Sequence, residues 1–110
     1  MNVIAIDPGT VTGYAFHGFH CGDHGTVNLA PATAAPTKGR IAEPEYARVG
    51  KLWLWLRTVK LGEVGVVVCE GAAGFTKGKA AVRVSHELRG VVKAWCWVNS
   101  VSYVEIQPMD

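Results

Sequence analysis

Two short apolar runs, each ending at a carboxylate, constrain the fold of this chain more than any other feature. Val3–Ile6 leads into Asp7, and Val66–Cys69 leads into Glu70. A continuous apolar run of this length is typical of a strand that is buried on both faces. Because crossover connections favour parallel neighbours, we expect the two carboxylates to emerge together at one edge of a sheet.

The remaining periodicities predict a mixed α/β domain with the order β-β-β-α-β-α-β. The turn at Asp7-Pro8-Gly9 starts an antiparallel meander of three strands. Apolar residues three and four positions apart predict two helices. Residues 30–44 contain three prolines and are interpreted as a flexible connection. The expected strands are 3–7, 13–17, 25–29, 64–70 and 101–106, and the expected helices are 45–60 and 80–97.

The composition excludes a membrane-spanning protein and favours one packed domain. The chain has 110 residues, of which 49% are hydrophobic, enough for a single core. No apolar stretch approaches the roughly 20 residues of a membrane span, and a carboxylate interrupts the first apolar run too early for a signal peptide. Cys69 and Cys96 lie among apolar residues and are expected in the core, which suits a reducing compartment. We therefore expect a cytosolic protein, with the four tryptophans supplying core and interface area.

Two interpretations of Asp7 and Glu70 follow from their positions. Adjacent strands lie about 4.8 Å apart, so the two carboxylates could share a hard cation such as Mg²⁺. Like charges placed that close repel each other unless a metal or a proton intervenes. Alternatively, Asp7 caps a common Asp-Pro-Gly turn, and Glu70 is only the first solvated residue after its strand. Spacing alone leaves both interpretations open.

Three motifs in order resemble the RuvC-type Holliday junction resolvases of the ribonuclease H-like superfamily. Residues 3–15, VIAIDPGTVTGYA, resemble the opening motif of that family, and Val67–Glu70 resembles its second motif, a strand that delivers a glutamate. Residues 80–92, AAVRVSHELRGVV, are similar to the helix that follows, and Val104–Pro108 falls where the family places its next strand. The likeness is strongest to the shorter phage versions and covers nearly the whole chain.

The resemblance implies a five-stranded ribonuclease H-like sheet with flanking helices and a metal-dependent endonuclease. Such enzymes resolve four-way DNA junctions in recombination and repair, using two Mg²⁺ ions about 4 Å apart, for which Mn²⁺ can substitute. Carried over by position, Asp7 would bridge both ions and Glu70 would hold one, which makes both residues catalytic. The implied partners are branched DNA and a second copy of the chain. The implied location is the cytoplasm of a bacterial cell or of a phage-infected host.

Four residues are expected to contact DNA. The resemblance places Phe75 in the loop after Glu70, where an aromatic ring can wedge between bases at the junction. The alternative is a loop residue that folds back on the core. Lys77, Lys79 and Arg83 would contact phosphates without reading sequence. Bases at a helix start oppose the helix dipole, which favours a phosphate role over a merely solvated surface.

The basic segment has two further features. Residues 71–98 carry five basic residues against one acid, so the segment could face a polyanion. Gly90 lies in mid-helix, where it costs about 1 kcal/mol relative to alanine. A close approach between helices, including one across a dimer interface, would explain a glycine there.

The chain departs from the family pattern at its end. The family supplies further acidic ligands from a last helix beyond the fifth strand, whereas this sequence ends at Asp110, which does not match that helix position. We therefore expect residues 1–110 to form a single nuclease domain that is C-terminally incomplete. Three alternatives stay open: a non-catalytic module that binds branched DNA, an RNA-processing nuclease of the YqgF type, and a relative of the actin-like ATPases and sugar kinases.

A second metal hypothesis concerns His17, His20, Cys21 and His24, which cluster within eight residues. These side chains could ligate zinc. However, the cluster falls at a predicted strand tip and matches no known zinc motif. The resemblance places no metal there, so we favour a solvated tip.

Overall fold

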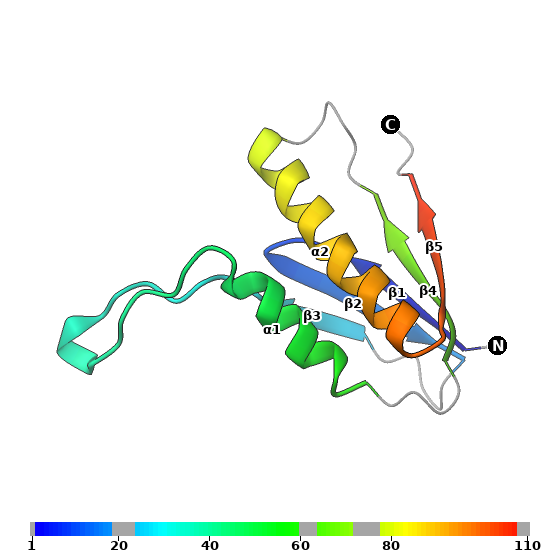
Figure 1. Cartoon of the computed structure of the whole chain (residues 1–110), viewed down its shortest axis with the longest axis horizontal. Helices are drawn as coiled ribbons and strands as arrows, with labels where there is room; N and C mark the ends of the chain where they lie inside the picture. Colours follow the sequence, from blue (N-terminus) through cyan, green and yellow to red (C-terminus); the bar gives the residue numbers. More distant parts are fainter. Residues whose placement is uncertain (1, 19–23, 60–63, 72–77, 108–110) are drawn as a thin grey trace.

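Five strands form one mixed sheet in the order β3-β2-β1-β4-β5 (Figure 1). This computed structural model describes residues 2–18, 24–59, 64–71 and 78–107. The elements are β1 (Asn2–Asp7), β2 (Val11–His17), β3 (His24–Asn28), the short 3₁₀ helix η1 (Pro36–Lys38), α1 (Ala47–Leu56), β4 (Val64–Glu70), α2 (Lys79–Val98) and β5 (Ser102–Ile106).

The connections explain the strand directions. A tight turn joins β1 to β2, so these strands pair antiparallel, and β2 pairs with β3 in the same way. By contrast, β4 and β5 are each reached through a segment that contains a helix, and each pairs in parallel with its neighbour. Parallel pairing needs such a crossover. The predicted α/β class, strand meander and element order are confirmed.

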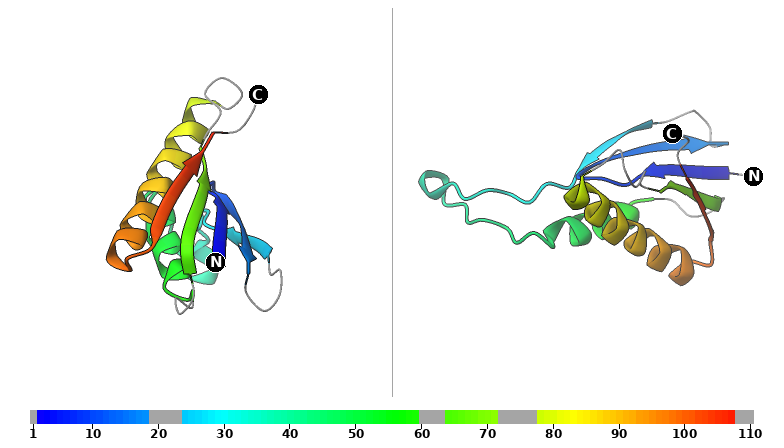
Figure 2. Two further views of the ribbon diagram at one scale, coloured as in Figure 1. Left: turned by 90° about the vertical axis from the view of Figure 1, so that its right-hand side faces the viewer. Right: turned by 90° about the horizontal axis from the view of Figure 1, so that it is seen from above.

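Both long helices pack against the same face of the sheet (Figure 2). Leu52 and Leu56 of α1 and Leu88 and Val92 of α2 are fully buried, because residues three and four apart share one helix face. The sheet contributes its own inward residues to this single core. The buried apolar residues of this core are Ile4, Ile6, Leu29, Leu52, Leu56, Val67, Cys69, Val84, Leu88, Val92, Trp95 and Cys96. No helix in the described ranges is long and apolar enough to cross a membrane.

The other face of the sheet, here called the open face, carries no helix among the described residues. Ala5 and Asp7 of β1 are exposed there, and Val104 and Ile106 of β5 are 46% and 52% exposed. Burial along β1 alternates between successive residues, as expected of a strand with one covered face. The expectation that this apolar run is buried on both faces is therefore wrong for the described chain.

The tryptophans do not share one environment. Trp95 is 2% exposed, and Trp53 and Trp55 pack at the edge of the core. Trp97 is 87% exposed, because two helical positions after Trp95 correspond to about 200° of rotation. Three of the four tryptophans therefore contribute to the core, as expected, and Trp97 lies on the surface of the monomer.

The buried thiols give a direct prediction. Burial raises the pKa of the Cys69 thiol to about 12 and that of Cys96 to about 11, and both side chains are buried. In a Cys21→Ser variant, we expect no reaction with a thiol-specific disulfide reagent at pH 8 until denaturant is added, because the thiolate is the reactive species. Stoichiometric labelling of the native protein within minutes would contradict this packing.

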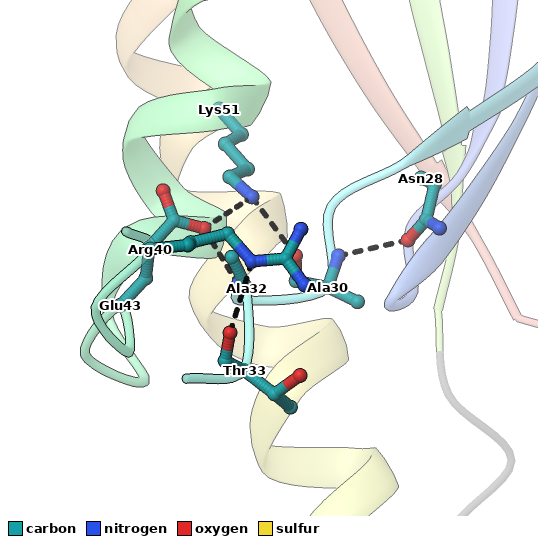
Figure 3. A network of polar contacts seen from close by, with 7 residues as sticks. All are labelled: Asn28, Ala30, Ala32, Thr33, Arg40, Glu43 and Lys51. Carbon is teal, nitrogen blue, oxygen red and sulfur yellow. Dashed lines mark hydrogen bonds and ion pairs between the residues drawn. The ribbon is translucent and has the colours of Figure 1, made fainter. Parts of the chain in front are cut away.

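The connection between β3 and α1 extends away from the sheet (Figure 1) and has more internal structure than its composition indicated. The Glu43 carboxylate accepts a hydrogen bond from the Ala32 N–H at 2.6 Å, and it forms an ion pair with Lys51 Nζ at 2.6 Å. Lys51 also donates to the Ala30 carbonyl at 2.9 Å (Figure 3). The bond from Lys51, followed by that from Ala32, lowers the pKa of the Glu43 carboxyl. These contacts fasten the base of the connection to α1.

Gly90 gives a second prediction. It lies inside α2 on the exposed side, and a Cβ added there would meet no atom within 4 Å. Gly90→Ala is therefore expected to raise the free energy of unfolding by about 1 kcal/mol, measured by urea denaturation. Gly25→Ala is the contrasting control, since its Cβ would come 2.8 Å from the Tyr14 hydroxyl. A loss of stability or of self-association in Gly90→Ala would instead support a close approach by another copy.

Candidate metal and nucleic-acid site

Asp7 and Glu70 end two neighbouring parallel strands. The register pairs Ile6 of β1 with Cys69 of β4, so the two carboxylates occupy the next position on each strand. Ile6 and Cys69 are buried beneath the helices, and successive side chains alternate between faces. Asp7 and Glu70 therefore both belong to the open face, at one end of strands that lie about 4.8 Å apart.

Asp7 and Glu70 both line a shallow depression of about 310 Å³ whose surface is mainly apolar. Its walls come from β1, β2, β4 and β5, and include Val68 and Ile106. Asp7 is exposed and Glu70 is half-buried. Gly13 of β2 is paired with Asp7, and because it has no side chain it leaves the β2 side of the aspartate unobstructed. The arrangement is an accessible, mainly apolar hollow, with two acidic residues in its wall, at the carboxyl end of the parallel strands, where ligands gather in α/β sheets.

The turn after Asp7 is held by a residue that the sequence analysis did not single out. Thr12 is fully buried. Its hydroxyl accepts a hydrogen bond from the Gly9 N–H at 3.3 Å and donates to the Gly9 carbonyl at 2.7 Å. Such local hydroxyl-to-backbone bonds are typical of threonine in turns and were the signal available in the sequence. With Thr12 holding the turn, Asp7 forms no capping bond within the described residues.

The donor set fits a hard divalent cation. Within the described residues, neither carboxylate forms a hydrogen bond or an ion pair, so the oxygens of both are available to a cation. Carboxylate oxygens are ligands for Mg²⁺ and Mn²⁺. No group of three histidine, cysteine, aspartate or glutamate residues is close enough to hold a metal in the described part of the chain. Water and substrate phosphates would have to complete the coordination.

The structure places two of the four expected DNA-contacting residues. Lys79 begins α2 and Arg83 follows one turn later, and both are exposed. Arg83 lies 3.4 Å from the Glu45 carboxylate, a pair of which both side chains are mostly exposed. Phe75 and Lys77 lie outside the described residues.

The zinc hypothesis acquires no support from the described residues. His17 ends β2 and His24 begins β3, while His20 and Cys21 lie outside the described ranges. No three-ligand group forms among the residues that the structure places.

The basic segment 71–98 does not uniformly face outward. Arg89 is 8% exposed and forms an ion pair with Glu105 of β5 at 2.9 Å. Tyr103 donates to the same carboxylate at 2.8 Å, and Lys93 stands 4.0 Å from it. The Tyr103 bond lowers the pKa of the Glu105 carboxyl most, and Arg89 and Lys93 lower it further, against desolvation. Burial is also the main cause that raises the pKa of Tyr103. The expectation that this whole segment faces a polyanion is wrong for Arg89, which joins α2 to the sheet.

This sheet order, with both long helices on one face, is that of a ribonuclease H-like fold. No protein-family model matches the sequence, and curated proteins give no significant match. Among solved structures, the chain is similar to Thermus thermophilus RuvC in complex with a Holliday junction substrate, with a TM-score of 0.73 and 20% identity over 99% of this chain and 66% of that one. It is also similar to a second Thermus thermophilus RuvC structure, with a TM-score of 0.65 and 21% identity over 99% of this chain and 65% of that one.

The chain therefore spans about two thirds of the length of these RuvC structures. The fold expected from the three sequence motifs is confirmed, and the likeness at this identity concerns the fold. RuvC supplies a structural comparison in which the same fold is bound to a four-way junction.

Proposed function

We propose that this chain is the nuclease-fold domain of an enzyme that hydrolyses phosphodiester bonds in four-way DNA junctions, with Mg²⁺ or Mn²⁺ held by Asp7 and Glu70. The single observation that carries the proposal is the placement of these two carboxylates. They end neighbouring parallel strands, share one hollow, and have no partner within the described residues. The similarity to a RuvC that is bound to a Holliday junction supports the choice of substrate.

The residues have distinct tasks in this proposal. Asp7 ends β1 and Glu70 ends β4, and both strands are hydrogen-bonded on both sides, so the shorter Asp7 side chain places its carboxylate more rigidly. Glu70 approaches from β4 with a longer side chain and completes the pair. When bound there, the metal would activate water for attack and stabilise the charge on the leaving oxygen. Because the hollow is open, a phosphodiester can approach both carboxylates without a rearrangement of the sheet.

Further residues would bind the DNA rather than react with it. Lys79 and Arg83 at the start of α2 would contact phosphates and provide affinity without sequence preference. Phe75 and Lys77 are assigned to DNA contact by the family resemblance. Two copies of the chain would cut symmetric strands of one junction, which makes a homodimer the proposed active form.

The small number of carboxylates at the site favours a second function, binding of branched DNA without cleavage. Two carboxylates hold Mg²⁺ weakly, since this ion retains its waters and relies on substrate phosphates. The described residues place no third ligand nearby. A domain with this site could bind branched DNA without cutting it.

The deciding experiment is incubation of an end-labelled four-way junction with the protein in Mg²⁺, in Mn²⁺ and in EDTA. A linear duplex of the same sequence and an RNA hairpin serve as controls. Metal-dependent cutting of the junction alone supports the proposal. Binding that persists in EDTA with no cutting in either metal supports the non-catalytic function, and preferential cutting of RNA supports the YqgF-type alternative. If the protein neither binds nor cuts the junction, both DNA proposals are overturned.

A further inference from the structure

A second pocket, of about 470 Å³, lies on the other side of the turn that follows Asp7. Its walls are the turn itself, from Pro8 to Thr10, and the beginnings of α1 and α2. Two arginines, Arg48 and Arg83, line it. Of the two expected DNA-contacting residues that the structure describes, Arg83 lines this pocket and Lys79 does not.

Arg48 is the first unusual feature of this pocket. The residue is 9% exposed, although it carries a full charge. Its Nε atom is buried without a hydrogen-bond partner among the described residues, and its nearest carboxylate oxygen, on Glu45, lies 3.8 Å from Nη1. A buried guanidinium without good partners is costly. An anion in the pocket would give this guanidinium a closer counter-charge than Glu45 does.

The start of α2 is the second, independent feature. This helix of 20 residues begins without a side-chain cap, since its N-cap is Gly78, and it has no acid in its first turn. The first amides of a helix have no intrahelical acceptor and form the positive end of its dipole. Ala80 and Ala81 line the pocket there, and their methyl groups leave the backbone accessible. Helix starts with this geometry bind phosphate groups.

In this structure the Glu45 carboxylate lies where an anionic ligand of the two arginines would bind. Its carboxylate lies 3.4 Å from Arg83 and 3.8 Å from Arg48, and its side chain is 68% exposed. Both distances exceed the 2.7–2.9 Å that is typical of a strong charge-assisted hydrogen bond. A phosphodiester has two non-bridging oxygens, each of which accepts more than one hydrogen bond, so it could satisfy both guanidinium groups and the helix amides together. The exposed Glu45 carboxylate is free to swing aside.

We propose that this pocket binds one backbone phosphate of the nucleic-acid strand that crosses the Asp7–Glu70 site. The identity of the ligand rests on the proposed function, because the pocket and the carboxylates flank the same turn at Pro8-Gly9-Thr10. The proposal requires that a strand whose reactive phosphodiester lies at the carboxylates passes this turn with another phosphate beside Arg48. The site also explains why Arg83 lies near a helix start, where the dipole disfavours a base.

The first test is a titration of ¹⁵N-labelled protein with inorganic phosphate, at constant ionic strength maintained with chloride. Chemical shifts are expected to change in the amides of residues 79–82, in Gly9 and in the Arg48 Nε–H. Changes that are absent, or scattered over the basic surface, would overturn the pocket. This measurement needs no cleavage activity, so it remains informative if the proposed nuclease function fails.

The second test measures the affinity for a fluorescent four-way junction in EDTA, and for the same junction in competition with free phosphate. Arg48→Met is expected to weaken binding about tenfold, as for loss of a charged hydrogen-bond donor to phosphate. Glu45→Gln is expected to strengthen it about threefold, because it removes the competing charge. Arg57→Gln, at the other end of α1, removes the same charge as the arginine variant and is the matched control.

Arg48→Met alters a buried residue and could disturb folding. Glu45→Gln alters an exposed residue and therefore tests the pocket independently. Equal effects of Arg48→Met and Arg57→Gln, with no gain in Glu45→Gln, would overturn the assignment. Phosphate-induced shifts without any variant effect on junction affinity would show that the pocket takes a small phosphate compound, and would overturn the nucleic-acid ligand. If the protein cuts the junction but these tests give the negative results, the phosphate pocket is refuted and the proposed nuclease function is not.

Discussion

Asp7→Asn and Glu70→Gln are each expected to lower the rate of metal-dependent junction cleavage by at least about 1,000-fold. Each change replaces a carboxylate oxygen by an amide nitrogen with almost no change in shape, so the strand pairing survives while the charge that attracts the metal is lost. Loss of several kcal/mol of metal-derived transition-state stabilisation corresponds to a factor of this size. The rate is measured under single-turnover conditions with saturating protein.

Glu87→Gln is the matched control, because Glu87 is an exposed carboxylate on α2. It should leave the cleavage rate within a factor of about two, as expected of a screened surface charge. Paramagnetic broadening of NMR signals by Mn²⁺ supplies a readout that is independent of activity: signals at the ends of β1 and β4 should broaden in the wild type and much less in Asp7→Asn. Cleavage that persists in both carboxylate variants would remove Asp7 and Glu70 from the site.

Loss of the Glu105 carboxylate is expected to be the most damaging change to stability. Glu105→Ala should lower the free energy of unfolding by about 3 kcal/mol, because the Arg89 guanidinium, with a side chain 10% exposed, would remain without its ion pair at 2.9 Å. The Tyr103 hydroxyl would also lose its acceptor. Urea denaturation followed by circular dichroism measures the change. Glu87→Ala removes an exposed carboxylate of α2 and should cost less than about 1 kcal/mol, so equal losses would contradict the distinction.

The same carboxylate predicts a pH dependence. The Tyr103 hydrogen bond, and then Arg89 and Lys93, hold the pKa of Glu105 below its ordinary value of 4.5. A group whose pKa is lowered by folding stabilises the native state above its unfolded pKa and loses that contribution as pH falls through the folded value. The stability difference between wild type and Glu105→Gln should therefore be constant from pH 7 to about pH 5 and shrink below pH 4.5. A difference that grows on acidification would contradict the lowered pKa.

Element positions followed from local patterns with small errors. The strand at 64–70 was predicted with its observed bounds, and the helix predicted at 80–97 is observed as Lys79–Val98. The first helix was predicted too long, since α1 ends at Leu56. There the Thr58 hydroxyl donates to the Trp55 carbonyl and its N–H bonds to the same oxygen, which ends the regular pattern. A threonine in the last turn competes with the helix for the same backbone groups.

Other features depended on contacts between residues far apart in the sequence. Arg89 has the same local surroundings as an exposed helix base, and only the arrival of β5 beside α2 gives it Glu105 as a partner. Likewise, Arg48 and Arg83 are separated by 35 positions, and the packing of α1 beside α2 brings them to one pocket. Sequence periodicity reports which face of a helix is apolar, and it contains no information on which charged group another element will supply.

The sequence by itself determined the α/β class, the order of the elements and the position of each carboxylate at the end of an apolar strand, because these depend on side-chain periodicity and turn chemistry within short segments. Only the tertiary structure decided that β1 and β4 pair in the register that aligns Asp7 with Glu70, that both helices cover one face, and that the hollow lined by the two acidic residues lies on the other. Register and layering result from non-local packing of the core, in which each strand must present its larger apolar side chains to the same pair of helices.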